Sequence, residues 1–419
     1  MNHTSGVIND ADPSAITIEQ ARSRVLENLA RIRETQTIDV SAALGRVVAV
    51  DIISPMSVPS FRASAMDGYA VRASDCTRPL KRVGQSLAGH PGDDHLSANT
   101  TQRITTGARV PDGADTVVQQ ENVELQGDTV IVLKQPQVGL HVRVPGTDSQ
   151  SGSVLLRAGV RIGAAETGLL AAHGITRVTV VRKLRISVFS TGDELVEASL
   201  DLERGQIYDA NRALLQALLD EPSCHVTDLG IIKDSINDLQ NVFDATHEAD
   251  LVLSSGGVSV GDADHVKTVL ESRGKISLWK IAMKPGRPLT FGLLDAGNVF
   301  FGLPGNPVSA ALTCLLFVKP AIAYLCGTQP DLVPPLQLVL RGSLSKNPGR
   351  VEYQRARMVY STGADPQWNV TTTGLQDSHV LSSLHKANCL IELPVHSTGA
   401  SDGDLVTVIP FSHFSRPVL

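Results

Sequence analysis

Two carboxylates beside a loop rich in glycine and serine are the first sign of chemistry in this sequence. Leu251–Leu253 is a short apolar run that predicts a buried strand, and it leads directly into Ser254–Gly257. A helix is predicted to resume near Ala263. Glycines let the backbone approach a ligand, and free N–H groups at a helix start attract negative charge. This strand, loop and helix are therefore typical of an anion-binding site.

The two carboxylates in the same loop, Asp262 and Asp264, would repel a bare phosphate. They fit an anion site if a divalent cation lies between them and the anion. The simpler alternative is that Asp264 only caps the following helix.

Two further segments have the same design. The strand predicted at Leu184–Phe189 leads into Ser190–Leu195. Asn298–Phe301 leads into Gly302–Pro307, whose last two residues suit a helix N-cap and first helical position. Three such joints indicate a mainly parallel sheet, and ligands on such sheets collect at the carboxyl ends of the strands. We therefore expect the three loops to meet at one cleft.

A pair of lysines adds positive charge near these loops. In the strand predicted at Ile276–Met283, a period of two places Lys280 and Lys284 on one face, about 13 Å apart. Lys284 also opens a turn that carries Arg287. Surface lysines are often merely solvated, but here the strand is otherwise apolar and the turn is expected to adjoin the Gly302–Pro307 loop, which favours anion binding.

Composition limits the class of protein. The 419 residues suggest roughly three domains, and 42% apolar content is ordinary for a globular chain. A net charge of −6 argues against a nucleic-acid or membrane surface. The five cysteines are scattered without a CxxC pair, which indicates reduced thiols in a cytoplasmic protein. We expect no signal peptide and no apolar run long enough to span a bilayer.

The remaining segments predict three other kinds of structure. A helix near Ile18–Ile32 begins with a capping box formed by Thr17 and Gln20. Residues 55–144 read as a small β domain inserted into the first domain, with a hairpin at Gln126–Asp128. Its loops Ser64–Ala70 and Thr105–Ala108 are each, taken singly, typical of ordinary turns. The tail after Pro330 has short strands and glycine turns that predict a small barrel or sandwich.

Six motifs in order carry a resemblance across nearly the whole chain: SAMDGYA, TTGA, STGDEL, SSGGVSVGDAD, MKPGRP and GLPGNPVSA. Together they resemble the molybdopterin molybdenumtransferase family, the MoeA-type proteins related to the C-terminal part of gephyrin. The resemblance implies a multi-domain α/β plus β fold. Its expected parts are a helical linker domain I (residues 1–54 and 145–182), a small β domain II (55–144), a three-layer α/β molybdopterin-binding domain III (183–328) and a C-terminal β-barrel domain IV (329–419).

The resemblance also implies an activity and partners. The family inserts molybdate into adenylylated molybdopterin, releases AMP and yields molybdenum cofactor with the help of Mg²⁺. The resemblance implies a cytoplasmic, elongated homodimer whose cleft takes residues from both subunits. The upstream molybdopterin adenylyltransferase is a further expected partner, and no nucleic acid or membrane is expected.

Family motifs carry over onto particular residues here. The expected catalytic residues are Asp67, Thr106, Asp148, Glu194, Asp234, Asp264, Lys280 and Lys284. Glu194 and Asp264 are the expected Mg²⁺ ligands. The expected substrate-binding residues are Ser190, Thr191, Gly192, Asp193, Ser255, Gly256, Gly257, Gly261, Arg287, Pro304, Gly305, Asn306, Pro307, Arg350 and Ser383. Arg355 is an alternative to Arg350 as an anion ligand, and Thr147 stands where the family often has an acidic residue.

Charge suggests a mechanism for that reaction. Molybdate must lose oxo groups as it gains two sulfur ligands, and an oxo group leaves readily only as water. Protonation by an acid such as Asp67 or Lys280 would therefore help. The lysines would offset anion–anion repulsion while Mg²⁺ polarises the phosphate.

Two alternatives remain open. An adenylyltransferase acting one step earlier would share the α/β domain, although the domains carrying Asp67 and Thr106 argue against it. A non-catalytic scaffold of the gephyrin kind would show a degenerate cleft, whereas every charged motif residue is present here. The chain contains neither GxxxxGK[ST] nor GxGxxG, so a Walker ATPase and a Rossmann dehydrogenase are not supported.

Overall fold

The computed structural model describes residues 12–256, 265–329, 334–362 and 366–411. The chain divides into two compact units. One comprises residues 1–49, 159–164 and 179–419, and the other residues 50–158 and 165–178.

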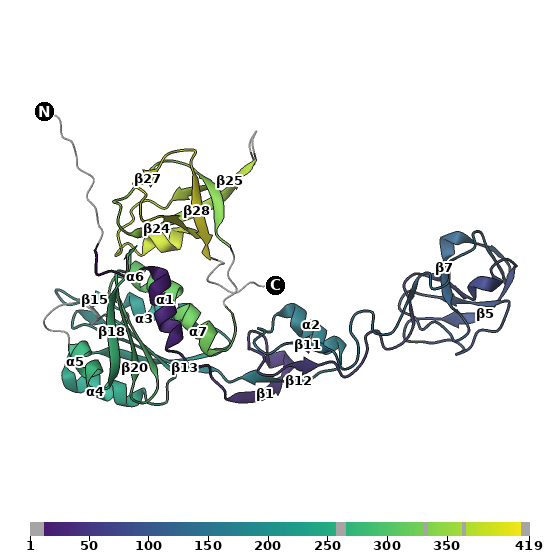
Figure 1. Ribbon diagram of the computed structural model, residues 1–419, viewed down its shortest axis with the longest axis horizontal. Coiled ribbons are helices and arrows are strands. Elements are labelled where there is room, and N and C mark those ends of the chain that lie inside the picture. The colour runs from purple at the N-terminus through teal and green to yellow at the C-terminus, as the bar shows by residue number, and fades with distance from the viewer. Residues whose placement is uncertain (1–11, 257–264, 330–333, 363–365, 412–419) are drawn as a thin grey trace. The chain divides into compact units, whose positions relative to one another are not determined.

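A six-stranded sheet is the centre of the larger unit (Figure 1). Its strands in spatial order are β16 (Cys224–Ile232), β13 (Leu184–Thr191), β17 (Leu251–Ser255), β21 (Val299–Leu303), β20 (Pro288–Leu294) and β18 (Gly274–Lys280). The first four strands run parallel to one another. β20 pairs antiparallel with β21, and β18 pairs antiparallel with β20. The prediction of a mainly parallel sheet is confirmed.

Alternation along the strands builds a core on each face of this sheet. Leu251 and Leu253 point into one hydrophobic cluster, and Val252 between them points into another. The first cluster is covered by α1 (Ile18–Glu27), α3 (Ala210–Leu219), α6 (Pro307–Thr313), the π-helical turn Cys314–Val318 and α7 (Lys319–Leu325). The second is covered by α4 (Ile236–Ala245) and α5 (His265–Glu271). The result is the expected three-layer α/β arrangement.

Helix signals in the sequence are mostly confirmed. The capping box of α1 forms, since the Thr17 side chain accepts from Gln20 N–H and the Gln20 side chain accepts from Thr17 N–H. The helix ends at Glu27, earlier than the predicted Ile32. The predicted helix start near Ala263 lies outside the described residues, and α5 is described from His265.

The expectation that no apolar run is long enough to span a bilayer is wrong. The continuous helical run Pro307–Leu325 is long and apolar enough to cross a membrane. In the structure, 83% of its most apolar window is buried inside the protein. This run is therefore the central core helix of the α/β layer, in contact with the sheet rather than with solvent.

The prediction of one continuous strand over Ile276–Met283 is also wrong. β18 ends at Lys280 and pairs with β20, whereas β19 (Met283–Lys284) pairs in parallel with β24 of the C-terminal sheet. Lys280 and Lys284 therefore belong to different sheets. The predicted common face for the two lysines does not exist.

The C-terminal region forms a closed five-stranded barrel, as predicted. The strands follow the order β24 (Val351–Ser361), β25 (Gln367–Thr372), β22 (Leu336–Leu340), β28 (Leu405–Pro410) and β26 (Cys389–Leu393), and β26 pairs back onto β24. A short helix, α8 (Ser382–Lys386), packs beside β24. Short pairings elsewhere join β23 (Leu344–Ser345) to β27 (Gly399–Ala400), β14 (Leu195–Val196) to β15 (Ile207–Tyr208), and β1 (Thr35–Asp39) to β12 (Arg177–Val181).

The smaller unit is built on a second six-stranded sheet, in agreement with the predicted β domain. Its order is β7 (Thr116–Gln119), β4 (Gly68–Val71), β6 (Thr100–Ile104), β5 (Leu80–Ser86), β9 (Thr129–Val132) and β8 (Val123–Gln126). The predicted hairpin is confirmed, since Gln126 pairs with Thr129 across a two-residue turn. Smaller elements are α2 (Ala164–Ala172) and the pairs β2 (Ile52–Ile53) with β11 (Val154–Leu156) and β3 (Ala63–Ser64) with β10 (Val142–Arg143).

The aromatic packing between the sheet and α4 generates a stability prediction. Phe300 is fully buried on β21, and its ring centroid lies 5.7 Å from that of Phe243 on α4. Phe300→Ala should lower the free energy of unfolding by about 3–5 kcal/mol, because it leaves a cavity in the core. The matched control is Ile236→Ala on the same layer, since Ile236 is 42% exposed and should cost less than about 1 kcal/mol. Urea unfolding measures both, and equal losses would contradict the assignment of this core.

Candidate active site

The parallel strands place three loops side by side at the carboxyl edge of the sheet. Ser190 at the end of β13 is in register with Ser255 of β17, and Ser255 is in register with Leu303 of β21. The STGDE, SSGG and GLPGNP segments therefore begin at adjacent points. Backbone hydrogen bonding of the sheet, rather than side-chain contacts, fixes this proximity.

Three buried hydroxyl groups at this edge have no hydrogen-bond partner among the described residues. They are Ser190 Oγ, Thr191 Oγ1 and Ser254 Oγ, and each residue is less than 5% exposed. A buried hydroxyl without a partner costs about 1–3 kcal/mol, so native proteins rarely leave several together. Hydroxyl donors at the end of a parallel sheet are suited to the oxygens of an oxyanion.

Glycine is required where two of these loops approach each other. Gly256 has φ +86°, and a Cβ built there would lie 2.5 Å from the carbonyl oxygen of Thr191. At residue 256 the two backbones are therefore in direct contact, with no room for a side chain. Gly192 has φ +149°, a backbone conformation that residues with a side chain rarely adopt.

Asn211 ties two of the loops together and was missed by the sequence reasoning. Its Nδ2 donates to Ser255 Oγ at 2.8 Å and to the Gly305 carbonyl oxygen at 2.7 Å. Asn211 is the second residue of α3, whose N-cap is Asp209. An amide two positions after a capping aspartate is a weak signal, and only the tertiary fold shows what it contacts.

Three predicted carboxylates of this unit, those of Asp193, Glu194 and Asp234, lie in or beside the STGDE loop. Asp193 Oδ1 accepts from the backbone N–H of Asp234 at 3.4 Å, and Asp234 Oδ1 is buried without a partner among the described residues. Glu194 is exposed, and its carboxylate folds over Gly192. Asp264, Gly257 and Gly261 lie outside the described residues. Within the described part of the chain, no group of three or more His, Cys, Asp or Glu side chains is arranged to hold a metal.

Each predicted cation has a carboxylate partner. Lys284 Nζ lies 3.4 Å from Glu352, whose side chain is only 6% exposed. Lys280 Nζ lies 3.5 Å from Asp12, which also pairs with Arg287. The pKa of Asp12 is well below its usual range, first because Ser14 donates hydrogen bonds and then because of the two cations. An anionic ligand reaching these cations must therefore exchange with carboxylates.

In the barrel, Arg355 contacts Ser383, one of the predicted substrate-binding residues. Arg355 is fully buried, its Nε donates to Ser383 Oγ at 2.9 Å and its Nη2 donates to the Asp377 carbonyl at 3.2 Å. Burial lowers the pKa of Arg355 to about 10. The neighbouring Ser378 carbonyl accepts from Val308 N–H at the start of α6, at 3.1 Å. Arg355 thus orders a loop that contacts the helix following GLPGN.

In the smaller unit, Asp67 and Thr106 are joined directly. Asp67 Oδ1 accepts from Thr106 N–H at 2.7 Å and from Thr106 Oγ1 at 2.9 Å. These two bonds, the backbone one first, lower the pKa of Asp67. Asp67 is therefore ionised at neutral pH, which opposes the expectation that it donates a proton. Asp148, also in this unit, lines a separate pocket together with Gly107.

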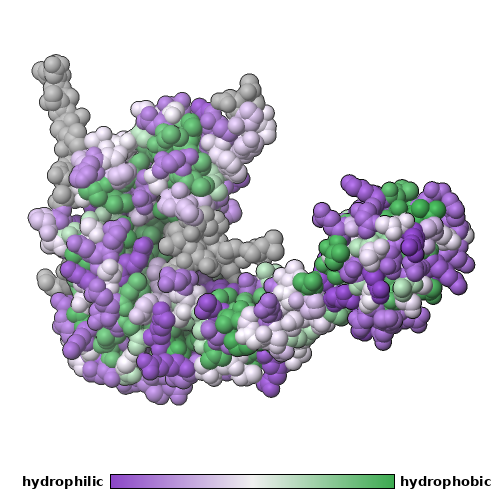
Figure 2. Space-filling view, turned by 45° about the vertical axis from the view of Figure 1, so that its right-hand side comes forward, coloured by the Kyte–Doolittle hydropathy of each residue, from purple (hydrophilic) through white to green (hydrophobic). Residues whose placement is uncertain are grey.

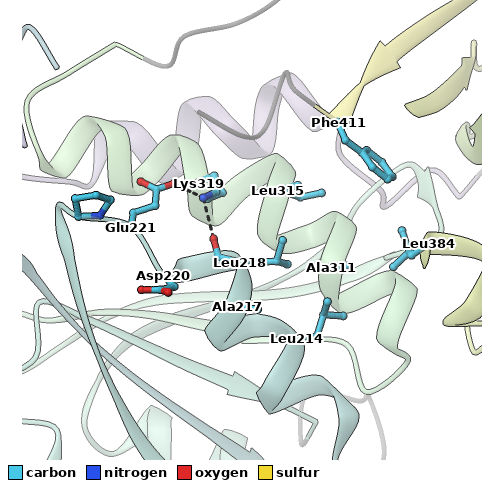
Figure 3. Close-up of a pocket in the computed structure, with 11 residues that line it drawn as sticks. Leu214, Ala217, Leu218, Asp220, Glu221, Ala311, Leu315, Lys319, Leu384 and Phe411 are labelled. Carbon is cyan, nitrogen blue, oxygen red and sulfur yellow. Dashed lines mark hydrogen bonds and ion pairs between the residues drawn. The ribbon is translucent and has the colours of Figure 1, made fainter. Parts of the chain in front are cut away.

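An apolar pocket in the larger unit contains none of the predicted site residues (Figure 3). It has a volume of about 410 Å³ and lies between the end of α3, the α6–α7 run, α8 and Phe411. Its walls are mainly aliphatic, with the Lys319–Glu221 ion pair at one end. Such a lining is unsuited to a phosphate, so this pocket does not compete with the carboxyl edge as the anion site.

Comparisons with known proteins agree with this fold. Residues 187–324 match the family described as "Probable molybdopterin binding domain", which defines the class of the α/β layer. Residues 16–174 match "MoeA N-terminal region (domain I and II)" and residues 337–411 match "MoeA C-terminal region (domain IV)".

Individual relatives extend over nearly the whole chain. A molybdopterin molybdenumtransferase of Haemophilus influenzae is 42% identical over 95% of this chain and 99% of its own length. Gephyrin of Dictyostelium discoideum is 33% identical over 94% of this chain, which spans 62% of that protein. The crystal structure of a molybdopterin biosynthesis MoeA protein from Pyrococcus horikoshii OT3 superposes with a TM-score of 0.80 at 27% identity, covering 94% of this chain and 100% of that one. The chain belongs to the molybdopterin molybdenumtransferase family.

The close approach at Gly256 generates a prediction with an internal control. Gly256→Ala should weaken AMP binding at least tenfold, because its Cβ would displace the Thr191 backbone by which the loop is set. Gly297 has the same φ of +86° but open space around its Cβ position. Gly297→Ala should carry the same backbone strain and leave AMP binding unchanged. Calorimetric titration with AMP compares the two, and parallel losses would show that strain rather than the loop contact matters.

Proposed function

We propose that this chain catalyses the insertion of molybdate into adenylylated molybdopterin, with release of AMP and formation of molybdenum cofactor. Relatives bearing the name molybdopterin molybdenumtransferase cover almost all of the chain. The structural observation that carries the proposal is the set of three unpartnered hydroxyls at the carboxyl edge of the sheet. They supply the donors that a phosphate ester needs.

Magnesium is part of the proposal, with Glu194 and Asp264 as its ligands. The donor set fits a hard cation, since carboxylate oxygens are the ligands that Mg²⁺ prefers. The carboxylate of Glu194 is exposed at the mouth of the loop and is free of hydrogen bonds and ion pairs with the described residues, so it is available. When bound, the ion would polarise the phosphate whose bond to the pterin is hydrolysed.

The residues of the chain have separable tasks in this reaction. Ser190, Thr191 and Ser254 bind and orient the phosphate by donating hydrogen bonds. Lys284 and Arg287 offset the charge of molybdate after exchanging their carboxylate partners for it. Since Asp67 is ionised, it accepts rather than donates, and Lys280 is the group left to protonate a leaving oxo ligand.

The assembly is proposed on the same basis. We propose a homodimer in the cytoplasm, fed by the upstream molybdopterin adenylyltransferase, and the four-domain division set out from the sequence. The similarity to MoeA proteins over the full chain supports these points. Analytical ultracentrifugation tests the dimer.

The decisive experiment for the activity also tests Asp67. Purified protein is incubated with adenylylated molybdopterin, Mg²⁺ and molybdate, and AMP release and cofactor formation are followed. Asp67→Asn should retain the fold and AMP binding but abolish cofactor formation, because a neutral amide replaces a carboxylate held by Thr106. Cofactor formation by this variant at the wild-type level would contradict the proposed role of Asp67. ATP-dependent adenylylation of metal-free molybdopterin by the wild type would instead identify an adenylyltransferase.

The Thr106 hydroxyl predicts a pH effect. Its hydrogen bond favours the charged form of Asp67, so Thr106→Val should raise the pKa of Asp67, although the stronger backbone bond remains. A carboxyl group whose pKa is lowered in the folded protein stabilises the fold at pH values above its pKa in the unfolded chain. This stabilisation is lost as the pH falls through the pKa in the folded protein. The acid limb of cofactor formation should therefore move to higher pH in Thr106→Val. Thr106→Ser keeps the hydroxyl and should titrate like the wild type, with carbon NMR of the Asp67 carboxyl as the direct measurement.

A further inference from the structure

A second pocket lies wholly within the smaller unit and contains one of the expected catalytic residues. It has a volume of about 470 Å³ and is lined by Val58, Pro59, Phe61, Gly107, Arg143 and Asp148 among others. Its size is in the range of pockets that hold small organic ligands. The lining combines an apolar floor, one aromatic ring, one cation and one carboxylate.

Asp148 is held in place by its neighbours in the backbone. Its N–H donates to the Val58 carbonyl at 3.0 Å, and Val58 N–H donates to the Ser149 carbonyl at 2.9 Å. These bonds belong to an isolated antiparallel bridge between Ser149 and Val58, and Val58 lines the pocket. The position of the Asp148 Cα is therefore determined before any ligand binds.

A buried histidine strengthens this support from behind. His173 is 1% exposed, and its Nδ1 lies 2.7 Å from the Leu169 carbonyl, which can only accept. Nδ1 therefore carries the proton, and Nε2 accepts from Ser149 Oγ at 2.5 Å. The residue next to Asp148 is thus anchored to the end of α2, which makes His173 and Ser149 positioning residues for the carboxylate.

The carboxylate itself is free. Among the described residues, no hydrogen bond or ion pair engages the Asp148 side chain, and the exposed Arg143 in the same pocket does not pair with it. Asp67 differs, because Thr106 donates twice to its Oδ1. A carboxylate on a fixed backbone, with both oxygens open, suits a ligand that presents two parallel N–H donors, as a guanidinium does.

Of the two ring systems in an adenylylated pterin, only one has that edge. The 2-amino-4-oxo pyrimidine ring of a pterin presents N3–H and the 2-amino group side by side. Adenine presents a donor beside an acceptor and cannot satisfy both carboxylate oxygens. Phe61, 42% exposed in the pocket, offers a face for stacking a planar ring, and Arg143 offers charge for anionic groups of the same ligand.

We propose that this pocket binds the pterin ring of the substrate, with the Asp148 carboxylate accepting from N3–H and the 2-amino group and Phe61 stacking on the ring. The assignment rests on the proposed function for the identity of the substrate. It gives Asp148 a task in recognition, separate from the phosphate site at the sheet edge.

Fluorescence titration with two small probes tests it on the full chain. Pterin carries the 2-amino group, and lumazine has an oxygen in its place. Wild-type protein should bind pterin at least tenfold more tightly than lumazine, because lumazine turns an acceptor towards the carboxylate. Asp148→Asn should lose that preference, and Ser149→Ala should reduce it while lumazine binding is unchanged. The exposed Glu124, which does not line the pocket, provides the control Glu124→Gln, expected to behave as wild type.

Several outcomes would overturn the proposal. These are equal binding of the two probes by the wild type, no detectable pterin binding, an unchanged preference in Asp148→Asn with circular dichroism showing a folded protein, or displacement of pterin by AMP alone. Failure is distinguishable from failure of the proposed function. Loss of the pterin preference with intact AMP release removes only the pterin pocket, whereas absent AMP release with the preference intact removes the reaction.

Discussion

The structure depends on one constraint: parallel strands in register end at the same edge. Hydrogen bonding between β13, β17 and β21 fixes Ser190, Ser255 and Leu303 in one row, so the segments that follow begin at adjacent points. Hydrophobic cores on both faces of the sheet then help to bury these strand ends. Hydroxyls that would otherwise be solvated are left buried without partners, at a cost that a bound oxyanion can offset. The binding site is thus a consequence of strand register.

Carboxylate partners balance the charge of the predicted cations. Lys284 pairs with the buried Glu352, and Lys280 and Arg287 share Asp12. Glu352 is buried, so moving Lys284 from it to a substrate anion would leave an unpaired buried carboxylate, a cost that binding of the anion must offset. Glu352 reaches Lys284 because β19 joins the barrel sheet at β24. The barrel therefore takes part in the electrostatics of the α/β layer.

Local sequence signals predicted the elements that local physics controls. The capping box at Thr17 and the two-residue hairpin turn are where short-range patterns placed them, and the strands β13, β17 and β21 each extend two residues beyond their predicted ends. The break between Lys280 and Met283 was not predictable, because it arises from pairing of Met283 with Val351, distant in sequence. The same holds for Asn211 and Arg355, whose partners come from other elements. Residue type gives the available chemistry, and only the tertiary partners decide how it is used.

Asp67 and Asp148 show how far that distinction reaches. Both are exposed aspartates in turns of the same unit, and the sequence assigns them the same kind of role. In the structure, Asp67 is occupied by two donors from Thr106 and has a lowered pKa, so it is a fixed negative charge at neutral pH. Asp148 is fixed through its backbone and through Ser149 and His173, which leaves its carboxylate open. Because Oδ1 of Asp67 already accepts twice, only the Asp148 carboxylate offers both of its oxygens to two parallel donors of a ligand. The pattern of hydrogen bonds around each group therefore separates an electrostatic role from a recognition role where residue type could not.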